Sequence, residues 1–355
     1  MPPSLEAILA DFDAGKPAAL ARAVSLVENH RDGYDTVMAR LHPRLGRAKR
    51  LGLTGPPGAG KSTLTNLIVG ALRERGERVG VIAVDPTSPF TGGALLGDRV
   101  RMESVSLDPG VFIRSMATRG SLGGLSARTA EVADVLDAFG FDWIVIETVG
   151  VGQSELDIAR TADTTVVVLV PESGDSIQTL KAGVMEVADI FVVNKADRPG
   201  ADRLRNDIEL MLGLRRGVAS AHVPAHHGVS HKTINPIRIA REAARAEAPE
   251  TWLPPVLQAI ASKGEGVADL LAAVERHFRY LETSGGLRER RRGRLRNQVV
   301  EVVAERVRTR LWGDDATQAW LEAQLPALEE GTATPFGVAD TLLRQSGPLL
   351  TGVPA

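Results

Sequence analysis

The sequence predicts a doubly wound α/β domain built on a mostly parallel sheet. From about residue 49 onward, short apolar runs alternate with segments of helical spacing. The apolar runs are rich in β-branched residues and lack polar alternation, which is typical of strands covered by helices on both faces. A glycine-rich turn joins the first strand to the first helix of this region. We therefore expect ligands at the carboxyl ends of the strands.

Composition limits the classes of protein to consider. The 355 residues are 43% hydrophobic and 24% charged, as in ordinary globular proteins, and the net charge of −2 gives no general reason to expect nucleic acid as a partner. The absence of cysteine excludes disulfides, thiolate zinc sites and thiol catalysis. Without a long apolar stretch or a leader-like N-terminus, we expect a cytoplasmic enzyme and no membrane contact.

The first part of the chain predicts helices. Apolar residues recur at helical spacing between residues 4 and 48, and Pro17 and Gly33 divide this stretch into two or three helices. We expect a helical N-terminal extension over residues 1–48 that packs on the domain formed by residues 49–283. The predicted strands of that domain cover residues 50–54, 79–84, 111–115, 142–147, 164–170, 189–193 and 256–261.

The turn after the first strand carries the phosphate-loop pattern G-x-x-x-x-G-K-S. Its glycines let backbone N–H groups surround a polyphosphate at the start of a helix. Lys61 is expected to meet the β- and γ-phosphates, and the Ser62 hydroxyl to ligate Mg²⁺. The predicted phosphate-binding residues are Gly55, Pro57, Gly58, Ala59, Gly60, Lys61, Ser62 and Thr63.

Acidic residues end two other predicted strands. Asp85 follows the strand over residues 79–84, and Glu147 ends the strand over residues 142–147. A carboxylate beside a phosphate loop is placed to hold Mg²⁺ or its waters, whereas the alternative for each is a helix cap or a turn. Gly150, which comes shortly after Glu147, is expected to contact the γ-phosphate.

The segment Asn194-Lys195-Ala196-Asp197 follows the strand over residues 189–193. A carboxylate in this setting accepts hydrogen bonds from both N1–H and the N2 amine of guanine, a pair of donors that adenine lacks. Ser262 and Lys263, at the end of the last predicted strand, complete the expected guanine site. The sequence therefore predicts that the domain binds GTP and GDP.

These motifs resemble the MeaB/ArgK-type P-loop GTPases, the family that includes the protein of methylmalonic aciduria type A. The matching segments run in family order over about residues 50–270. The most specific of them is Glu147-Thr148-Val149-Gly150-Val151-Gly152-Gln153-Ser154-Glu155. The resemblance implies a P-loop GTPase sheet and a GTPase chaperone of adenosylcobalamin-dependent acyl-CoA mutases. Such chaperones control loading of the cofactor and help to expel inactivated cobalamin.

The resemblance also implies roles for individual residues. It implies that Mg²⁺ is surrounded by four residues, Ser62, Asp85, Asp98 and Glu147. It implies mobile switches over residues 85–102 and 147–155, and a third over residues 172–181 that couples the nucleotide state to the mutase. Lys181, at the end of this third segment, is the candidate catalytic residue beside Lys61 and Glu147, although a solvated helix lysine is the simpler interpretation.

Slow intrinsic hydrolysis follows from one departure from Ras-like GTPases. Those enzymes use a glutamine to orient the attacking water. Here Val151 stands at that place, and valine cannot orient water. We therefore expect a second group, supplied with a partner, to stimulate hydrolysis.

An insertion at about residues 216–250 departs from the usual family pattern. It contains His222, His226, His227 and His231. The spacing allows a metal site, but Pro224 and Gly228 interrupt the pairs. The preferred interpretation is a polar loop, and one version of it has this loop contact the partner protein.

Residues 284–355 are expected to form a helical C-terminal dimerisation arm. The basic run over residues 287–296 leads into a helical stripe of Leu295, Val299, Val303, Val307 and Leu311. Nucleic-acid binding is the alternative, but the run lacks interleaved aromatic residues. The stripe suits packing on the domain or on a second copy, and the resemblance favours a homodimer.

Two other functions are considered. A nickel-insertion GTPase is expected to have a metal-binding tail rich in histidine or cysteine, which this chain lacks. An ATP-dependent kinase of periplasmic transport conflicts with the guanine motif. The resemblance leaves the mutase open among those acting on methylmalonyl-CoA, isobutyryl-CoA, ethylmalonyl-CoA and 2-hydroxyisobutyryl-CoA.

Overall fold

A computed structural model describes residues 4–85, 105, 107–117, 124–148, 154–171, 185–215 and 251–347. The chain divides into two compact units, residues 1–291 and 292–355. The N-terminal helices belong to the first unit together with the sheet. The second unit begins inside the long helix α14 (Gly286–Trp312) and includes α15 (Asp315–Glu329) and α16 (Pro335–Gln345).

The first unit is organised around a seven-stranded sheet of order β3-β2-β4-β1-β5-β6-β7, and every pairing between these strands is parallel. The strands are β1 (Lys49–Thr54), β2 (Val79–Asp85), β3 (Val111–Ala117), β4 (Trp143–Thr148), β5 (Thr164–Leu169), β6 (Ile190–Asn194) and β7 (Val256–Ala259). The predicted fold class is confirmed. The last strand is shorter than predicted, because it ends at Ala259 and a 3₁₀ turn, η4 (Ala261–Lys263), follows.

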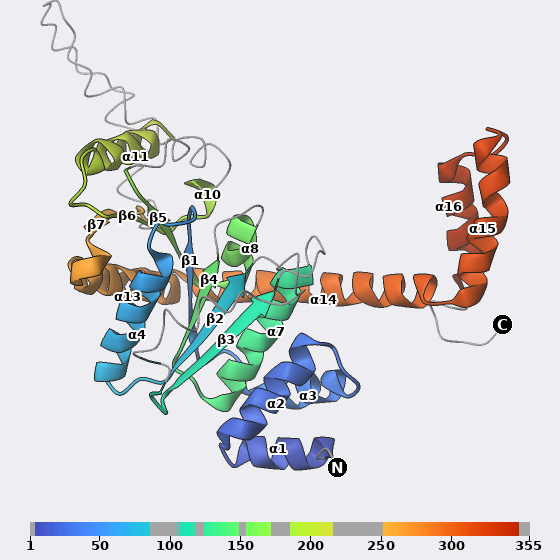
Figure 1. Ribbon diagram of the computed structural model, residues 1–355, viewed down its shortest axis with the longest axis horizontal. Coiled ribbons are helices and arrows are strands. Elements are labelled where there is room, and N and C mark those ends of the chain that lie inside the picture. The colour runs from blue at the N-terminus through green and yellow to red at the C-terminus, as the bar shows by residue number, and fades with distance from the viewer. Residues whose placement is uncertain are drawn as a thin grey trace, which may run out of the picture. The chain divides into compact units, whose positions relative to one another are not determined.

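Helices cover both faces of this sheet (Figure 1). In the first unit they are α1 (Leu5–Asp13), α2 (Pro17–Glu28), α3 (Tyr34–Leu41), α4 (Lys61–Glu74), α7 (Gly124–Phe139), α8 (Ser154–Thr161), α10 (Met185–Val187), α11 (Ala201–Arg215) and α13 (Val267–Ser284). A 3₁₀ turn, η1 (His42–Arg44), follows α3. None of the helices in the described part of the chain is both long and apolar enough to cross a bilayer.

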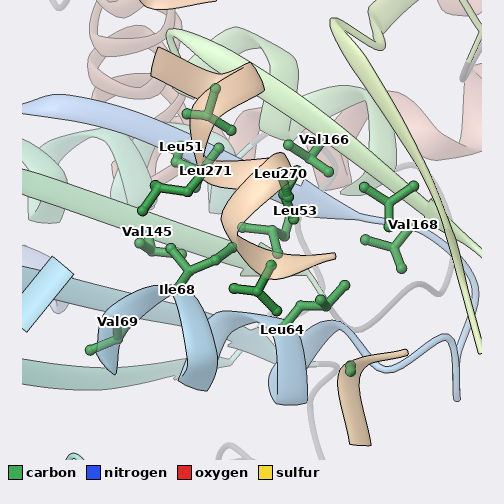
Figure 2. Packing of buried hydrophobic residues seen from close by; sticks show 14 of the residues in the cluster. Leu51, Leu53, Leu64, Ile68, Val69, Val145, Val166, Val168, Leu270 and Leu271 are labelled. Carbon is green, nitrogen blue, oxygen red and sulfur yellow. The ribbon is translucent and has the colours of Figure 1, made fainter. Parts of the chain in front are cut away.

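One face packs against α4 and α13. Side chains that alternate along the central strands, such as Leu51 and Leu53 of β1, point to this face and meet Leu64 and Ile68 of α4 and Leu270 of α13 (Figure 2). All five are fully buried. Each such side chain contributes about 1.5–3 kcal/mol of burial free energy, so this layer fixes the position of α4 and of the loop that precedes it.

The opposite face packs against α7, α8 and the N-terminal helices at one end of the sheet, and against α11 at the other. Ile144 and Ile146 of β4 point to this face. The N-terminal helices form where the sequence indicates, because Pro17 occupies the first turn of α2 and Gly33, with a φ of 89°, precedes α3. Their apolar side chains share one cluster with α7.

A network of charged side chains ties residues 46–48, which lead into β1, to the amino edge of the sheet. The Asp137 carboxylate of α7 accepts hydrogen bonds from the backbone N–H groups of Gly46, Arg47 and Ala48, at 2.7, 3.1 and 3.0 Å. Arg291, in the first turns of α14, donates to the carbonyl oxygens of Gly46 and Ala48. Side chains therefore provide hydrogen-bond partners for the three backbone N–H groups of this segment and for two of its carbonyl oxygens.

Two buried aspartates at the same edge bind the start of α14. Asp163 precedes β5 and accepts from Arg291 Nη2 at 3.0 Å, and Asp189 precedes β6 and accepts from both Nη atoms of Arg290, at 2.7 and 2.8 Å. Part of the predicted basic run therefore pairs with carboxylates of the first unit. These pairs hold the first turns of α14 against the amino edge of the sheet.

His277 of α13 lies beside this network and gives the fold a pH dependence. Burial lowers the pKa of His277 from its ordinary 6.5 to about 4, against the attraction of the nearby Asp189 carboxylate and in concert with Arg290. The unfolded chain therefore binds a proton between pH 6.5 and pH 4 that the folded chain excludes. The His277 contribution to stability is complete above pH 6.5 and is lost as the pH falls through this window.

We expect His277→Gln to remove a slope of up to about 1.4 kcal/mol per pH unit from the free energy of unfolding between pH 6.5 and pH 4. Urea unfolding of both proteins at several pH values measures the difference. Glutamine keeps a polar group near the Thr164 hydroxyl, which lies 2.9 Å from His277 Nδ1. Parallel pH profiles for the two proteins would contradict the assignment.

Candidate nucleotide-binding site

The phosphate loop lies between the end of β1 and the start of α4, at the carboxyl edge of the sheet. Gly55 and Gly60 have φ values of 138° and 89°, which favour glycine. A Cβ on Gly55 would lie 2.0 Å from the Val168 carbonyl oxygen, and one on Gly60 would lie 2.3 Å from Asn194 Nδ2. The two glycines therefore allow the loop to approach both β5 and β6. The N–H groups at the start of α4 provide the positive end of a helix dipole for an anion.

Lys61 turns back over this loop from the first residue of α4. Its Nζ donates to the carbonyl oxygens of Gly55 and Pro56, at 2.8 and 2.9 Å, and the residue is only 5% exposed. The ammonium group is thus held over the concave side of the loop by uncharged carbonyl groups. A polyphosphate can displace those weaker partners, because charge-assisted hydrogen bonds are the stronger ones.

The Glu147 carboxylate at the end of β4 meets two hydroxyl groups of α4. Ser62 Oγ donates to Glu147 Oε1 at 2.5 Å, and Thr65 Oγ1 donates to Glu147 Oε2 at 2.9 Å. The sequence motifs indicate Ser62 and Glu147 but not Thr65. The signal for Thr65 is its spacing of three residues from Ser62, which places both hydroxyls on one side of the helix. The hydroxyl and carboxylate oxygens are donors that Mg²⁺ prefers.

Asn194, the first residue of the predicted guanine segment, connects three parts of the site. Its Nδ2 donates to the Ala59 carbonyl oxygen of the phosphate loop at 2.7 Å, and its Oδ1 accepts from the Ala261 N–H at 3.1 Å. Asn194 is 2% exposed, whereas Asp197 is exposed in the turn that follows β6. Lys195 between them has a φ of 56°, the left-handed region.

The remaining predicted site residues fall into two groups. Ser262 and Lys263 lie in η4, directly after the residue that binds Asn194, and Thr63 is exposed in the first turn of α4. The structure therefore brings the phosphate loop, Glu147 and both guanine segments to one edge. Asp98, Gly150, Lys181 and the insertion over residues 216–250 lie outside the described residues, and Asp85 is described only as the last residue of β2.

No group of three or more acidic, histidine or cysteine side chains within the described ranges is placed to hold a metal ion. A magnesium site formed by Ser62 and Glu147 must therefore draw its other ligands from phosphate oxygens, water or side chains beyond those ranges. This is common for Mg²⁺, which keeps several waters and is held by one or two carboxylates together with substrate phosphates.

The chain is similar to known proteins over most of its length. The chain is 42% identical over 341 residues to a putative GTPase of Pyrococcus horikoshii, covering 96% of this chain and 98% of that protein. It is 31% identical to the mitochondrial methylmalonic aciduria type A homolog of Mus musculus, covering 93% and 76%. The crystal structure of a LAO/AO transport system kinase has a TM-score of 0.66 at 25% identity and covers 97% of this chain and 99% of that one.

The match to a protein family spans most of the chain, both units included. Residues 20–316 match the family described as methylmalonyl Co-A mutase-associated GTPase MeaB. This range contains the phosphate loop, Glu147, the guanine segments and all of α14. The chain is therefore a member of the MeaB family of methylmalonyl-CoA mutase-associated GTPases.

Proposed function

We propose that this GTPase is a chaperone of an adenosylcobalamin-dependent acyl-CoA mutase of the methylmalonyl-CoA mutase type. In this function it gates loading of the cofactor, protects the mutase and promotes its reactivation. The observation that carries the proposal is the family match over residues 20–316, since the family is described by its association with that mutase. Cobalamin is bound by the partner and not by this chain.

The site geometry supports a division of labour among its residues. The N–H groups of the loop and Lys61 bind the phosphates, while Asn194 holds the loop against the guanine segments. Ser62 and Glu147, which lie within hydrogen-bond distance of each other, would hold Mg²⁺, and the ion would supply positive charge to the phosphates. Val151 leaves the attacking water without an orienting amide, so intrinsic turnover is slow and the partner stimulates it.

The test is GTP turnover with and without a mutase. The protein is assayed alone and with purified mutases specific for methylmalonyl-CoA, isobutyryl-CoA, ethylmalonyl-CoA and 2-hydroxyisobutyryl-CoA. Stimulation by one of them supports the proposal and identifies the partner. Lys181→Ala is assayed in parallel to test Lys181 as the residue that stabilises the γ-phosphoryl transition state, in which case stimulation is lost and nucleotide affinity is kept. A lack of stimulation by every mutase would contradict the proposed function.

Guanine selectivity is expected to depend on Asp197. Its carboxylate is exposed at the carboxyl edge of β6, where two donors of a guanine ring can reach it. Asp197→Asn replaces one acceptor oxygen by a donor and removes the charge, so the preference for GDP over ADP is expected to fall by roughly 10- to 100-fold. Calorimetric titration of both proteins with GDP and ADP measures it. Equal affinities of the wild-type protein for GDP and ADP would refute the guanine assignment.

We also propose that the chain forms a homodimer through α14. The stripe of Leu295, Val299 and Val303 is not buried by the second unit itself, and an apolar face of this kind requires a partner surface. Sedimentation of the wild-type protein and of a variant with Val299→Glu and Val303→Glu distinguishes the states. A wild-type protein that sediments as a monomer at all concentrations would exclude this dimer.

A further inference from the structure

The Glu147 carboxylate is held by two side chains that come from successive turns of one helix. Ser62 lies at the second position of α4 and Thr65 one turn further along. Each hydroxyl takes a different oxygen of the carboxylate, Oε1 for Ser62 and Oε2 for Thr65. Glu147 is 6% exposed and Thr65 is fully buried. The orientation of the carboxylate is therefore set from both sides.

The hydrogen bond of Thr65 is not the one that a helical threonine usually makes. A buried threonine in a helix commonly donates to the carbonyl oxygen four residues earlier, here that of Lys61. Thr65 donates to Glu147 instead, across the layer between α4 and the sheet. Its β-branched side chain has few rotamers in a helix, so the hydroxyl is held in place.

The hydroxyl groups of Ser62 and Thr65 are expected to respond differently to the binding of nucleotide and Mg²⁺. Ser62 is the residue placed to ligate Mg²⁺, so the position of its hydroxyl, and with it the bond to Glu147 Oε1, would depend on the metal. Thr65 lies deeper in α4, where the core residues Leu64 and Ile68 fix the helix. Its bond to Oε2 would therefore hold the carboxylate whether or not the metal is bound. A carboxylate anchored at Oε2 would keep Oε1 turned toward Ser62 and the metal site beside it.

We propose that Thr65 is a positioning residue for the magnesium-dependent step: it anchors Glu147 Oε2 so that Oε1 faces the metal and its waters. The inference rests on the proposed magnesium role of Glu147. Thr65 itself does not contact nucleotide or metal. Its effect is therefore expected in the magnesium dependence of nucleotide binding rather than in binding without metal.

The test compares Thr65→Val with Thr65→Ser. Valine has the shape of threonine without the hydroxyl, whereas serine keeps the hydroxyl. Affinity for a non-hydrolysable GTP analogue is measured by calorimetry over a series of Mg²⁺ concentrations, and affinity for GDP is measured in EDTA. We expect Thr65→Val to raise the Mg²⁺ concentration for half-maximal tightening roughly tenfold, the effect of one hydrogen bond to a charged group, with unchanged GDP affinity in EDTA. Thr65→Ser is expected to resemble the wild-type protein.

Thr164→Val is the matched control. Thr164 is also a buried threonine with a single side-chain partner, His277, but it lies at the amino edge of the sheet. This variant is expected to lose stability without any change in magnesium dependence. Thermal melting of each variant checks folding, and Thr65→Ala, which adds no bulk, provides the same measurement if Thr65→Val does not fold.

The variant Glu147→Gln distinguishes the positioning role of Thr65 from the metal role of Glu147. If Glu147→Gln shifts the magnesium dependence and Thr65→Val does not, the role of Thr65 is refuted while the metal role of Glu147 stands. If Glu147→Gln has no effect on the magnesium dependence, the role of Thr65 and the metal role of Glu147 are both refuted. An equal loss of affinity for Thr65→Val with and without Mg²⁺ would show a structural role only, and would also overturn the proposal.

Discussion

Replacing Lys61 by alanine is expected to lower GTP turnover by about 10²- to 10³-fold, the cost of removing one preorganised charge-stabilising donor. In the structure the Lys61 ammonium is already over the loop, held by the carbonyl oxygens of Gly55 and Pro56. The side chain therefore needs little rearrangement to reach phosphate. Because the charge on the phosphates is present in both GTP and the transition state, affinity for the nucleotide is expected to fall as well.

Single-turnover hydrolysis and calorimetric binding of GDP measure the two effects of Lys61→Ala. Lys16→Ala is the control, since Lys16 is exposed on the N-terminal extension and pairs only with Asp11 among the contacts described. It is expected to leave both quantities unchanged. Turnover of Lys61→Ala within threefold of wild type would show that Lys61 does not act on the phosphates.

Replacing Asp137 by alanine is expected to lower the free energy of unfolding of the first unit by about 3–5 kcal/mol. The carboxylate satisfies three consecutive backbone N–H groups, and Ala48, the last of them, is 1% exposed. Its removal leaves these donors without a partner of equal strength. It also removes one of the charges beside the buried Arg50 guanidinium, which lies 3.7 Å away.

Urea unfolding monitored by tryptophan fluorescence measures this loss, and Asp142→Ala is the matched control. Asp142 also accepts a hydrogen bond from a backbone N–H, that of Arg78 at 2.7 Å, but it is exposed to water. Its replacement is expected to cost only about 0.5–1.5 kcal/mol. If the two variants lost the same stability, the three bonds of Asp137 would not act together.

Much of the fold follows from local patterns in the sequence. The β-branched run over residues 164–169 and the apolar run over residues 143–146 are buried as continuous strands, because both of their faces meet helices. The phosphate loop and the segment from Asn194 to Asp197 are equally local, since each is read within a few residues. Their meeting at one edge follows from the parallel arrangement of the strands.

The contacts that sequence patterns do not reveal are those between distant polar residues. Asp137 reads as a polar position of a helix, yet it binds a segment about ninety residues earlier. In the sequence Arg290 and Arg291 are part of a basic run that leads into a helix, yet they pair with Asp189 and Asp163. Thr65 reads as an ordinary helix residue. In each case the partner is set by topology, and no spacing along the chain encodes it.

The central position of β1 has a consequence for how the chain folds. Leu51 pairs with Val145 of β4 and with Thr164 of β5. The strand β1 therefore has no strand to pair with until the ribosome has synthesised β4. At ribosomal rates of about 5–20 residues per second, the nascent strand waits roughly 5–20 s for β4. During that time its open edges are available to wrong pairing, and chaperone demand is expected to depend on the speed of translation between these strands.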